Sequence, residues 1–273
     1  MSGAASNGGI WLEALSGAEL SMARPPATVV SIDAPLGDER ARYIGVVPDP
    51  RNRFPRARHG EVGLEEGWAL ARDVREVIDE DSGKSKRPIV AIVDVSSQAY
   101  GRVEELLGIH LACAAAADAY ASARLAGHPV VALLVGKAMS GAFLAHGYQA
   151  NRILALDSPD VSVHAMGQQA AARVTRRSVH ELEQLGERIP PMSYHVRSFA
   201  SLGLLHRLIE GVNAAAPMPA DVESVRGALI EAVVDARRSS CDLSQRWSNE
   251  AARLTRAASI AVRRKLAEQW NES

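Results

Sequence analysis

A small-residue segment around Ser140 lies where an apolar run passes into a helical pattern. Residues 130–135 are almost wholly apolar, as expected of a strand buried on both faces. A small-residue turn at 136–142 follows, and residues 143–150 have helical spacing. Because the first N–H groups of a helix lack partners and favour negative charge, such a turn suits a developing oxyanion. The candidate donors here are Ser140, Gly141 and Ala142.

A second turn of the same kind follows the apolar run 89–95 and precedes a predicted helix over 103–125. The backbone at Ala99, Tyr100 and Gly101 forms the second candidate hole, although a purely structural turn fits equally well. Gln98 can offer a neutral side-chain donor to a carboxylate, or it is a solvated loop residue.

Two further residues are candidates for substrate binding beside the first turn. Lys137 is placed to attract a carboxylate, and His164 ends the next predicted strand, 161–164. The plainer interpretations are an exposed loop lysine and a hydrogen-bonded structural histidine.

Composition excludes several classes of function. The chain has 273 residues, 47% of them hydrophobic, and its net charge of -1 argues against nucleic acid as the main partner. Its two cysteines, Cys113 and Cys241, lack CxxC spacing, so we expect no disulfide framework and no metal site. There is no secretory signal and no run long enough to span a membrane, which predicts a cytoplasmic protein without membrane contact.

The strand-turn-helix pattern occurs twice in succession, and this predicts a parallel sheet covered by helices. Predicted strands cover residues 27–32, 43–47, 89–95, 130–135, 153–156 and 161–164. Predicted helices cover residues 10–20, 64–78, 103–125, 143–150, 167–184, 193–210, 221–238 and 243–270.

Three stretches carry a resemblance to a known family: IVDVSSQAYGRVEELLG, GKAMSGAFLAHGYQANRILAL and VSVHAMGQQAAARV. The two turns resemble those of the crotonase superfamily, and more closely its carboxyltransferase branch, which acts on acyl thioesters. Together the stretches are similar to the gamma subunits of biotin-independent malonate decarboxylases. The resemblance implies an α/β ClpP/crotonase fold over residues 27–211, with an N-terminal extension at 1–26 and C-terminal helices at 212–273.

The resemblance also implies a reaction and partners. With a homologous beta subunit, such a chain decarboxylates a malonyl thioester to an acetyl thioester and CO2. The malonyl group is carried on the phosphopantetheine-type, coenzyme A-like arm of an acyl carrier protein, and an alpha subunit exchanges acetyl for malonyl on that arm. No cofactor is bound directly, and neither biotin nor metal is used. Loss of CO2 leaves an enolate, which requires oxyanion donors and a pocket that strips water from the carboxylate.

The turns depart from the glycine-rich pattern of the wider family. The first contains Ser96, Ser97 and Gln98, and the second contains Ala138 and Met139 before Ser140. Glycine is the easiest residue for unusual backbone, so one of the two turns could be structural.

Three other functions compete with decarboxylation. Ser140 and His164 occur in the order of a Clp-type serine peptidase, but no Asp occurs between His164 and Asp221 to orient the histidine. A non-catalytic scaffold subunit is the second alternative. A hydratase is the third, and it would need a pair of carboxylates that the sequence does not offer.

The predicted last helix is basic. Its cations are Arg253, Arg256, Arg263, Arg264 and Lys265. They form either a solvated face or a docking strip for an acidic carrier protein.

Overall fold

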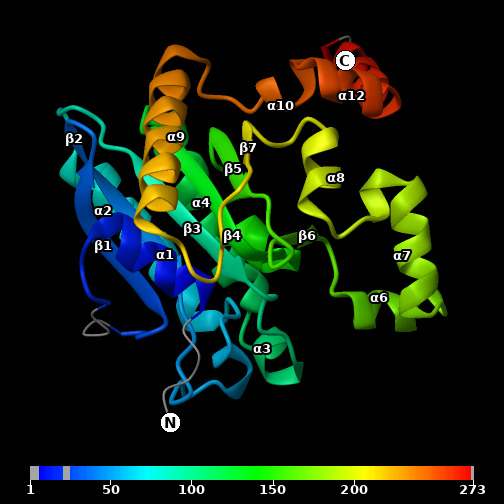
Figure 1. Cartoon of the computed structure of the whole chain (residues 1–273), viewed down its shortest axis with the longest axis horizontal. Coiled ribbons are helices and arrows are strands. Elements are labelled where there is room, and N and C mark those ends of the chain that lie inside the picture. Colours follow the sequence, from blue (N-terminus) through cyan, green and yellow to red (C-terminus); the bar gives the residue numbers. More distant parts are fainter. Residues whose placement is uncertain (1–5, 21–24, 272–273) are drawn as a thin grey trace.

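The computed structural model describes residues 6–20 and 25–271, and its central element is one sheet of seven strands within those ranges (Figure 1). Residues 1–5 and 21–24, which belong to the predicted N-terminal extension, lie outside the described residues. The strands are β1 (Val29–Leu36), β2 (Glu39–Val46), β3 (Ile89–Val95), β4 (Val130–Met139), β5 (Arg152–Leu156), β6 (Ser162–His164) and β7 (Arg207–Ile209). The order is β1-β2-β3-β4-β5-β7, with β6 paired to β4, and only the β1–β2 pair is antiparallel. The predicted helix-flanked, mostly parallel sheet is therefore confirmed.

Helices cover both faces of this sheet (Figure 1). Helices α1 (Asn7–Ser16) and α9 (Pro219–Arg238) pack on one face, and α2 (Leu64–Glu80) and α4 (Ile109–Leu125) pack together on the other. Trp11 of α1 and Leu229 of α9 are fully buried in the same core as the strands. Helices from outside residues 27–211 thus complete the core of the sheet, while the division into 1–26, 27–211 and 212–273 stays a prediction.

The remaining helices lie mainly beyond the sheet. They are α3 (Arg102–Leu106), α5 (Ser140–Ala145), α6 (Gln168–Thr175), α7 (Val179–Arg188), α8 (Val196–Ser201), α10 (Gln245–Ser248), α11 (Glu250–Thr255) and α12 (Ala257–Asn271). Figure 1 shows α6 to α8 and α10 to α12 past the β7 edge of the sheet. Short 3-10 helices cover Pro55–Ala57 and Pro190–Met192.

Strands β3 and β4 form the centre of the core, as their apolar sequences predict. Every residue of β3 except Asp94 is buried. The Asp94 carboxylate accepts hydrogen bonds from the backbone N–H groups of Gly8, at 3.1 Å, and Lys137, at 3.0 Å. A Cβ at Gly136 would lie 2.1 Å from Asp94 Oδ1, so this position requires glycine. Asp94 therefore joins the end of β3 to α1 and to the carboxyl half of β4.

Two of the predicted helices are interrupted by residues with positive φ. The helix predicted over 103–125 is divided at Gly108, which has φ +84°. The helix predicted over 167–184 is divided at Arg176, with φ +55°, and α7 then begins with Ser178 as its N-cap. Left-handed backbone cannot continue a right-handed helix, so both single-helix predictions were wrong.

Two other helix predictions were wrong because tertiary contacts end or divide the helices. The helix predicted over 193–210 stops at Ser201, and its end becomes β7, where Ile209 pairs with Leu156 of β5. The helix predicted over 243–270 is three helices, with Asn249 capping α11. Its basic strip is not continuous, because Arg256 donates to Leu202 O at 2.8 Å and Arg263 lies over the Trp247 ring at 4.5 Å.

Three arginines anchor the C-terminal helices to the loop after α5. Arg152 pairs with Asp235 of α9, and buried Arg246 donates to Ala150 O at 2.5 Å. Arg124 of α4 donates to the carbonyls of Gln149 and Cys241. Each guanidinium satisfies main-chain carbonyls or a carboxylate where burial would otherwise be costly. These contacts connect residues 149–152, which follow α5 in the chain, to the C-terminal part of the protein.

His146 gives the fold a pH dependence. Its ring is fully buried, with Nδ1 3.0 Å from the Tyr120 hydroxyl and Nε2 3.0 Å from Ile92 O, and burial lowers its pKa to about 4. The unfolded chain takes up this proton near pH 6.5, so the stabilisation is complete above that pH and is lost as pH falls toward 4. We expect a loss of about 3 kcal/mol in the free energy of unfolding from this group alone.

Urea unfolding between pH 7 and pH 4 measures this effect against His146→Leu. The variant should be less stable at pH 7, because Ile92 O loses its donor, but its stability should fall less steeply with acid. Parallel pH profiles for the two proteins would contradict the assignment.

Candidate functional site

The site is organised by one sharp bend between β4 and α5. Strand β4 continues to Met139 because β6 pairs with its end, in the register Ala138↔Val163 and Met139↔His164. Helix α5 begins at the next residue, Ser140, whose φ is +60°. Positive φ is uncommon for a residue other than glycine. The turn predicted at 136–142 was wrong, because β4 runs to Met139 and the bend is a single residue. The helix predicted over 143–150 is present but with other bounds, since α5 covers Ser140–Ala145.

The two predicted turns meet at Gly141. Its backbone N–H donates to the side-chain oxygen Oε1 of Gln98 at 2.9 Å. A Cβ at Gly141 would lie 3.1 Å from the same oxygen, so a side chain at this position would crowd Gln98. The Gly141 N–H, which a substrate oxyanion would need as a donor, is therefore already bonded to an amide oxygen. The same bond shows that this N–H points outward from the bend.

The first turn uses part of its backbone for structure. The Ala99 N–H donates to Val62 O at 2.8 Å, and the Val62 N–H donates to Ser97 O at 3.1 Å. Gly101 packs tightly, since an added Cβ would lie 2.6 Å from both Arg56 Nε and Glu104 Oε2. The Ala99 N–H thus has a main-chain acceptor in this structure, whereas Tyr100 is half exposed beside the bend.

Three hollows adjoin the bend. The outer cleft, of about 600 Å³, is lined by residues including Ser96, Tyr100, Lys137, Ser140, Arg173 and Tyr194. The α4–α5 cavity, of about 520 Å³, is lined by residues including Gln98, Cys113, Gly141, Leu144 and Tyr148. The His164 cavity, of about 450 Å³, is lined by residues including Ser140, Gly141, His164, Met192 and Phe199. Ser140 and Gly141 each border two of them, while Ala142 is fully buried behind the bend.

The His164 ring is held by one hydrogen bond and one stacking contact. Its Nδ1 is 2.9 Å from Met166 O, and its ring stacks on Tyr194 with 4.0 Å between centroids. Burial lowers the pKa of His164, so its neutral form is favoured. Within the described residues no carboxylate lies within hydrogen-bond distance of this ring. The orienting acid of a Ser–His–Asp triad thus has no counterpart here.

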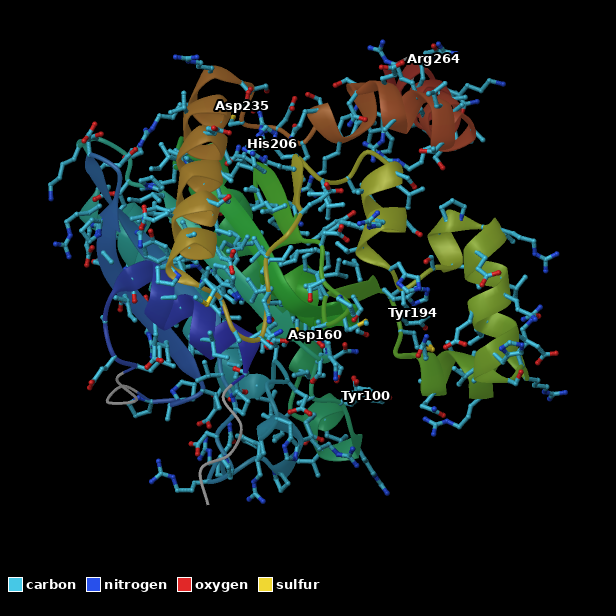
Figure 2. All side chains as sticks on the ribbon, viewed as in Figure 1. Tyr100, Asp160, Tyr194, His206, Asp235 and Arg264 are labelled. Atoms are coloured by element: carbon cyan, nitrogen blue, oxygen red, sulfur yellow. The ribbon has the colours of Figure 1, made fainter. Side chains whose placement is uncertain are left out.

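The sequence analysis did not single out Arg173 or Tyr194, which line the outer cleft. Figure 2 labels Tyr100 beside α3 and Tyr194 between β6 and α6, two elements that border this cleft. Tyr194 falls inside the helix wrongly predicted over 193–210, and its hydroxyl donates to Met166 O at 2.6 Å. Arg173 follows three alanines in α6, where nothing in the local pattern marks it.

Two structural findings concern metals and membranes. Across residues 6–20 and 25–271, no three His, Cys, Asp or Glu side chains gather as a metal-binding group. In the same ranges, no helix has both the length and the apolarity needed to cross a membrane.

The mostly parallel sheet, with a strand-to-helix bend at its carboxyl edge, defines an α/β fold of the crotonase-like carboxyltransferase class. The transcarboxylase 12S structure shares this fold at a TM-score of 0.58 and 19% identity, over 79% of this chain and 36% of that one. The chain belongs to the malonate decarboxylase gamma subunit family, whose model matches residues 57–270. This confirms the family that the three sequence stretches resemble.

Individual relatives agree with the family. A chain in the crystal structure of a Pseudomonas malonate decarboxylase hetero-tetramer in complex with coenzyme A matches with a TM-score of 0.91 and 54% identity, over 97% of this chain and 100% of that one. A chain of the Pseudomonas MdcD–MdcE hetero-dimer matches with a TM-score of 0.88, also at 54% identity, with the same coverage. The malonyl-S-ACP:biotin-protein carboxyltransferase MADD of Malonomonas rubra is 38% identical over 193 residues, which are 69% of this chain. The chain spans 66% of the length of that relative.

Proposed function

We propose that this chain, paired with a homologous beta subunit, decarboxylates a malonyl thioester to an acetyl thioester and CO2. The malonyl group is carried on the phosphopantetheine-type arm of an acyl carrier protein, and an alpha subunit reloads that arm. The observation that carries the proposal is the match over 97% of the chain to a chain of a malonate decarboxylase. The bend at Ser140 supplies a physical basis for the reaction.

In the proposed reaction, the bond between the carboxylate carbon and the α-carbon breaks and CO2 leaves. The electron pair stays on the substrate as an enolate, with its charge on the thioester oxygen, and a proton later adds to the α-carbon. The Gly141 N–H is the proposed principal donor to that oxygen, because its present acceptor, Gln98 Oε1, is a neutral and displaceable group. We propose that the catalytic site also contains Ser140, Ala142, Ala99 and Tyr100. We propose that the substrate-binding surface is formed by Gln98, Gly101, Lys137 and His164.

The proposed beta subunit would cover the face formed by α3, α4 and α5. This face exposes several large apolar side chains: Val103, Leu106, Leu107, Leu111 and Leu144. Leu144 also lines the α4–α5 cavity together with Gly141. A partner on this face would bury apolar surface and exclude water beside the donor in the same step.

The test is CO2 release from malonyl coenzyme A, measured for this chain alone and for the chain co-expressed with its beta subunit. We expect release only from the pair, because the α4–α5 cavity is open to solvent in the isolated chain. Release from this chain alone would contradict a shared site. No release from an assembled pair would contradict decarboxylation itself.

Carboxyl transfer to a biotin protein is the second candidate, because the Malonomonas rubra relative carries that activity in its name. The two reactions differ in the fate of the carboxyl group. Decarboxylation by the pair should continue unchanged with avidin added and no biotin protein present. Strict dependence on a biotin-bearing acceptor would favour the transferase.

A further inference from the structure

We propose that Arg173 and Lys137 bind an anionic group of the acyl-thioester substrate in the outer cleft. The inference rests on the proposed function and deepens it, since it assigns a substrate-recognition role to Arg173. Two anions of such a substrate have suitable chemistry: the free carboxylate of the malonyl group, and a phosphate of the carrier arm.

The first argument is the charge of the cleft lining. Lys137 follows the buried part of β4, and Arg173 lies in the last turn of α6, so the two cations come from different elements bordering one cleft. No Asp or Glu is among the described residues that line it. Asp160 lies in the sequence between two lining residues, Pro159 and Val161, but does not itself line the cleft. A lining with two cations and no carboxylate favours an anion.

The second argument is that neither cation is engaged elsewhere. Most arginines near the sheet are bound to carboxylates or main-chain carbonyls, as Arg124, Arg152 and Arg246 are. Within the described part of the chain, the side chains of Arg173 and Lys137 have no hydrogen-bond or ion-pair partner. A guanidinium presents a planar fork of donors that matches a carboxylate or a phosphate in two parallel bonds. Arg173 is thus available for an incoming ligand.

The third argument is the position of the cleft relative to the bend. Ser140 lines both the outer cleft and the His164 cavity, and the N–H of the next residue, Gly141, is the proposed oxyanion donor. A thioester lying with its oxygen at Gly141 therefore has the outer cleft as a neighbour for its charged end. The side chains of Tyr100 and Tyr194 also line this cleft.

The experiment compares three ligands on the assembled pair. Malonyl-pantetheine carries the carboxylate without phosphate, acetyl coenzyme A carries phosphates without the carboxylate, and malonyl coenzyme A carries both. The variants are Arg173→Gln and Lys137→Gln, and the matched control is Arg177→Gln, an exposed arginine just beyond α6 that does not line the cleft. The readouts are KM for the two malonyl thioesters and the calorimetric Kd for acetyl coenzyme A.

We expect Arg173→Gln to raise KM for malonyl coenzyme A roughly 10- to 100-fold with a smaller effect of Lys137→Gln, because a guanidinium makes two parallel bonds where an ammonium is a point charge. If the variant loses affinity for malonyl-pantetheine but not for acetyl coenzyme A, the bound group is the carboxylate. If it loses affinity for acetyl coenzyme A but not for malonyl-pantetheine, the bound group is a phosphate. Either result supports the proposal. Unchanged affinity for all three ligands overturns it, as does an equal loss in Arg177→Gln. If the wild-type pair proves inactive, the malonyl thioesters are not consumed, and their Kd is measured directly. The cleft is then tested even where the proposed function fails.

Discussion

Gly141→Val should reduce kcat for malonyl thioester decarboxylation by about 100- to 1000-fold in a pair that still assembles. Valine would place its Cβ 3.1 Å from Gln98 Oε1, beside the N–H that we propose as the donor to the thioester oxygen. Gly141 lies inside α5 with ordinary helical backbone, so the substitution acts on the space in front of the N–H rather than on the backbone. The measurement is steady-state CO2 release, with assembly checked by co-elution.

The control for this variant is Gly227→Val. Gly227 lies within α9, and no atom is within 4 Å of a Cβ added there, so the same bulk is placed far from the bend. That variant should keep its activity. Full activity in an assembled Gly141→Val pair would favour the scaffold alternative, in which the beta subunit holds all of the reacting groups.

Gly67→Ala should lower the free energy of unfolding by about 2 kcal/mol, although it places the best helix former in a helix. Gly67 is where α2 touches α4, and an added Cβ would lie 2.7 Å from both the carbonyl carbon and the carbonyl oxygen of Ala112. Those atoms belong to the backbone, so the two helices must separate to make room. The two helices also pack on β1, β2 and β4, so separating them disturbs part of the core, which is why one methyl group has a large effect.

Gly227→Ala is the matched comparison, because it makes the same change at an open position in α9. It should raise the stability by about 1 kcal/mol, as glycine-to-alanine changes do in exposed helix interiors. Urea unfolding of the three proteins provides the test. Equal shifts in the two variants would show that α2 and α4 are not in close contact.

The main architecture could be predicted from local patterns. The runs 89–95 and 130–135 are apolar because parallel strands buried on both faces need apolar side chains on both sides. The helix at Leu64–Glu80 follows from its 3.6-residue spacing. The three stretches around these elements also sufficed to indicate the malonate decarboxylase gamma subunit family. In each case the signal lies within a few neighbouring residues.

Other features depend on residues far apart in the chain. The bend contracts to Ser140 because β6 extends β4, and the segment predicted as the end of a helix becomes β7 because β5 offers it an open edge. Backbone pairing across such distances overrides local propensity.

The details of the candidate site were decided in the same way. Gln98 and Gly141 are 43 residues apart, yet one hydrogen bond joins them. Arg173 of α6 and Lys137 of β4 border one cleft only because the fold brings these two elements to its walls. Hydrophobic periodicity records which face of an element is buried, whereas the distance between two polar groups on different elements is set by how those elements pack. The sequence therefore determined the central strands of the sheet, the positions of the helices that cover them and the family. The tertiary structure alone decided the edge strand β7 and which donors and cations face a common space.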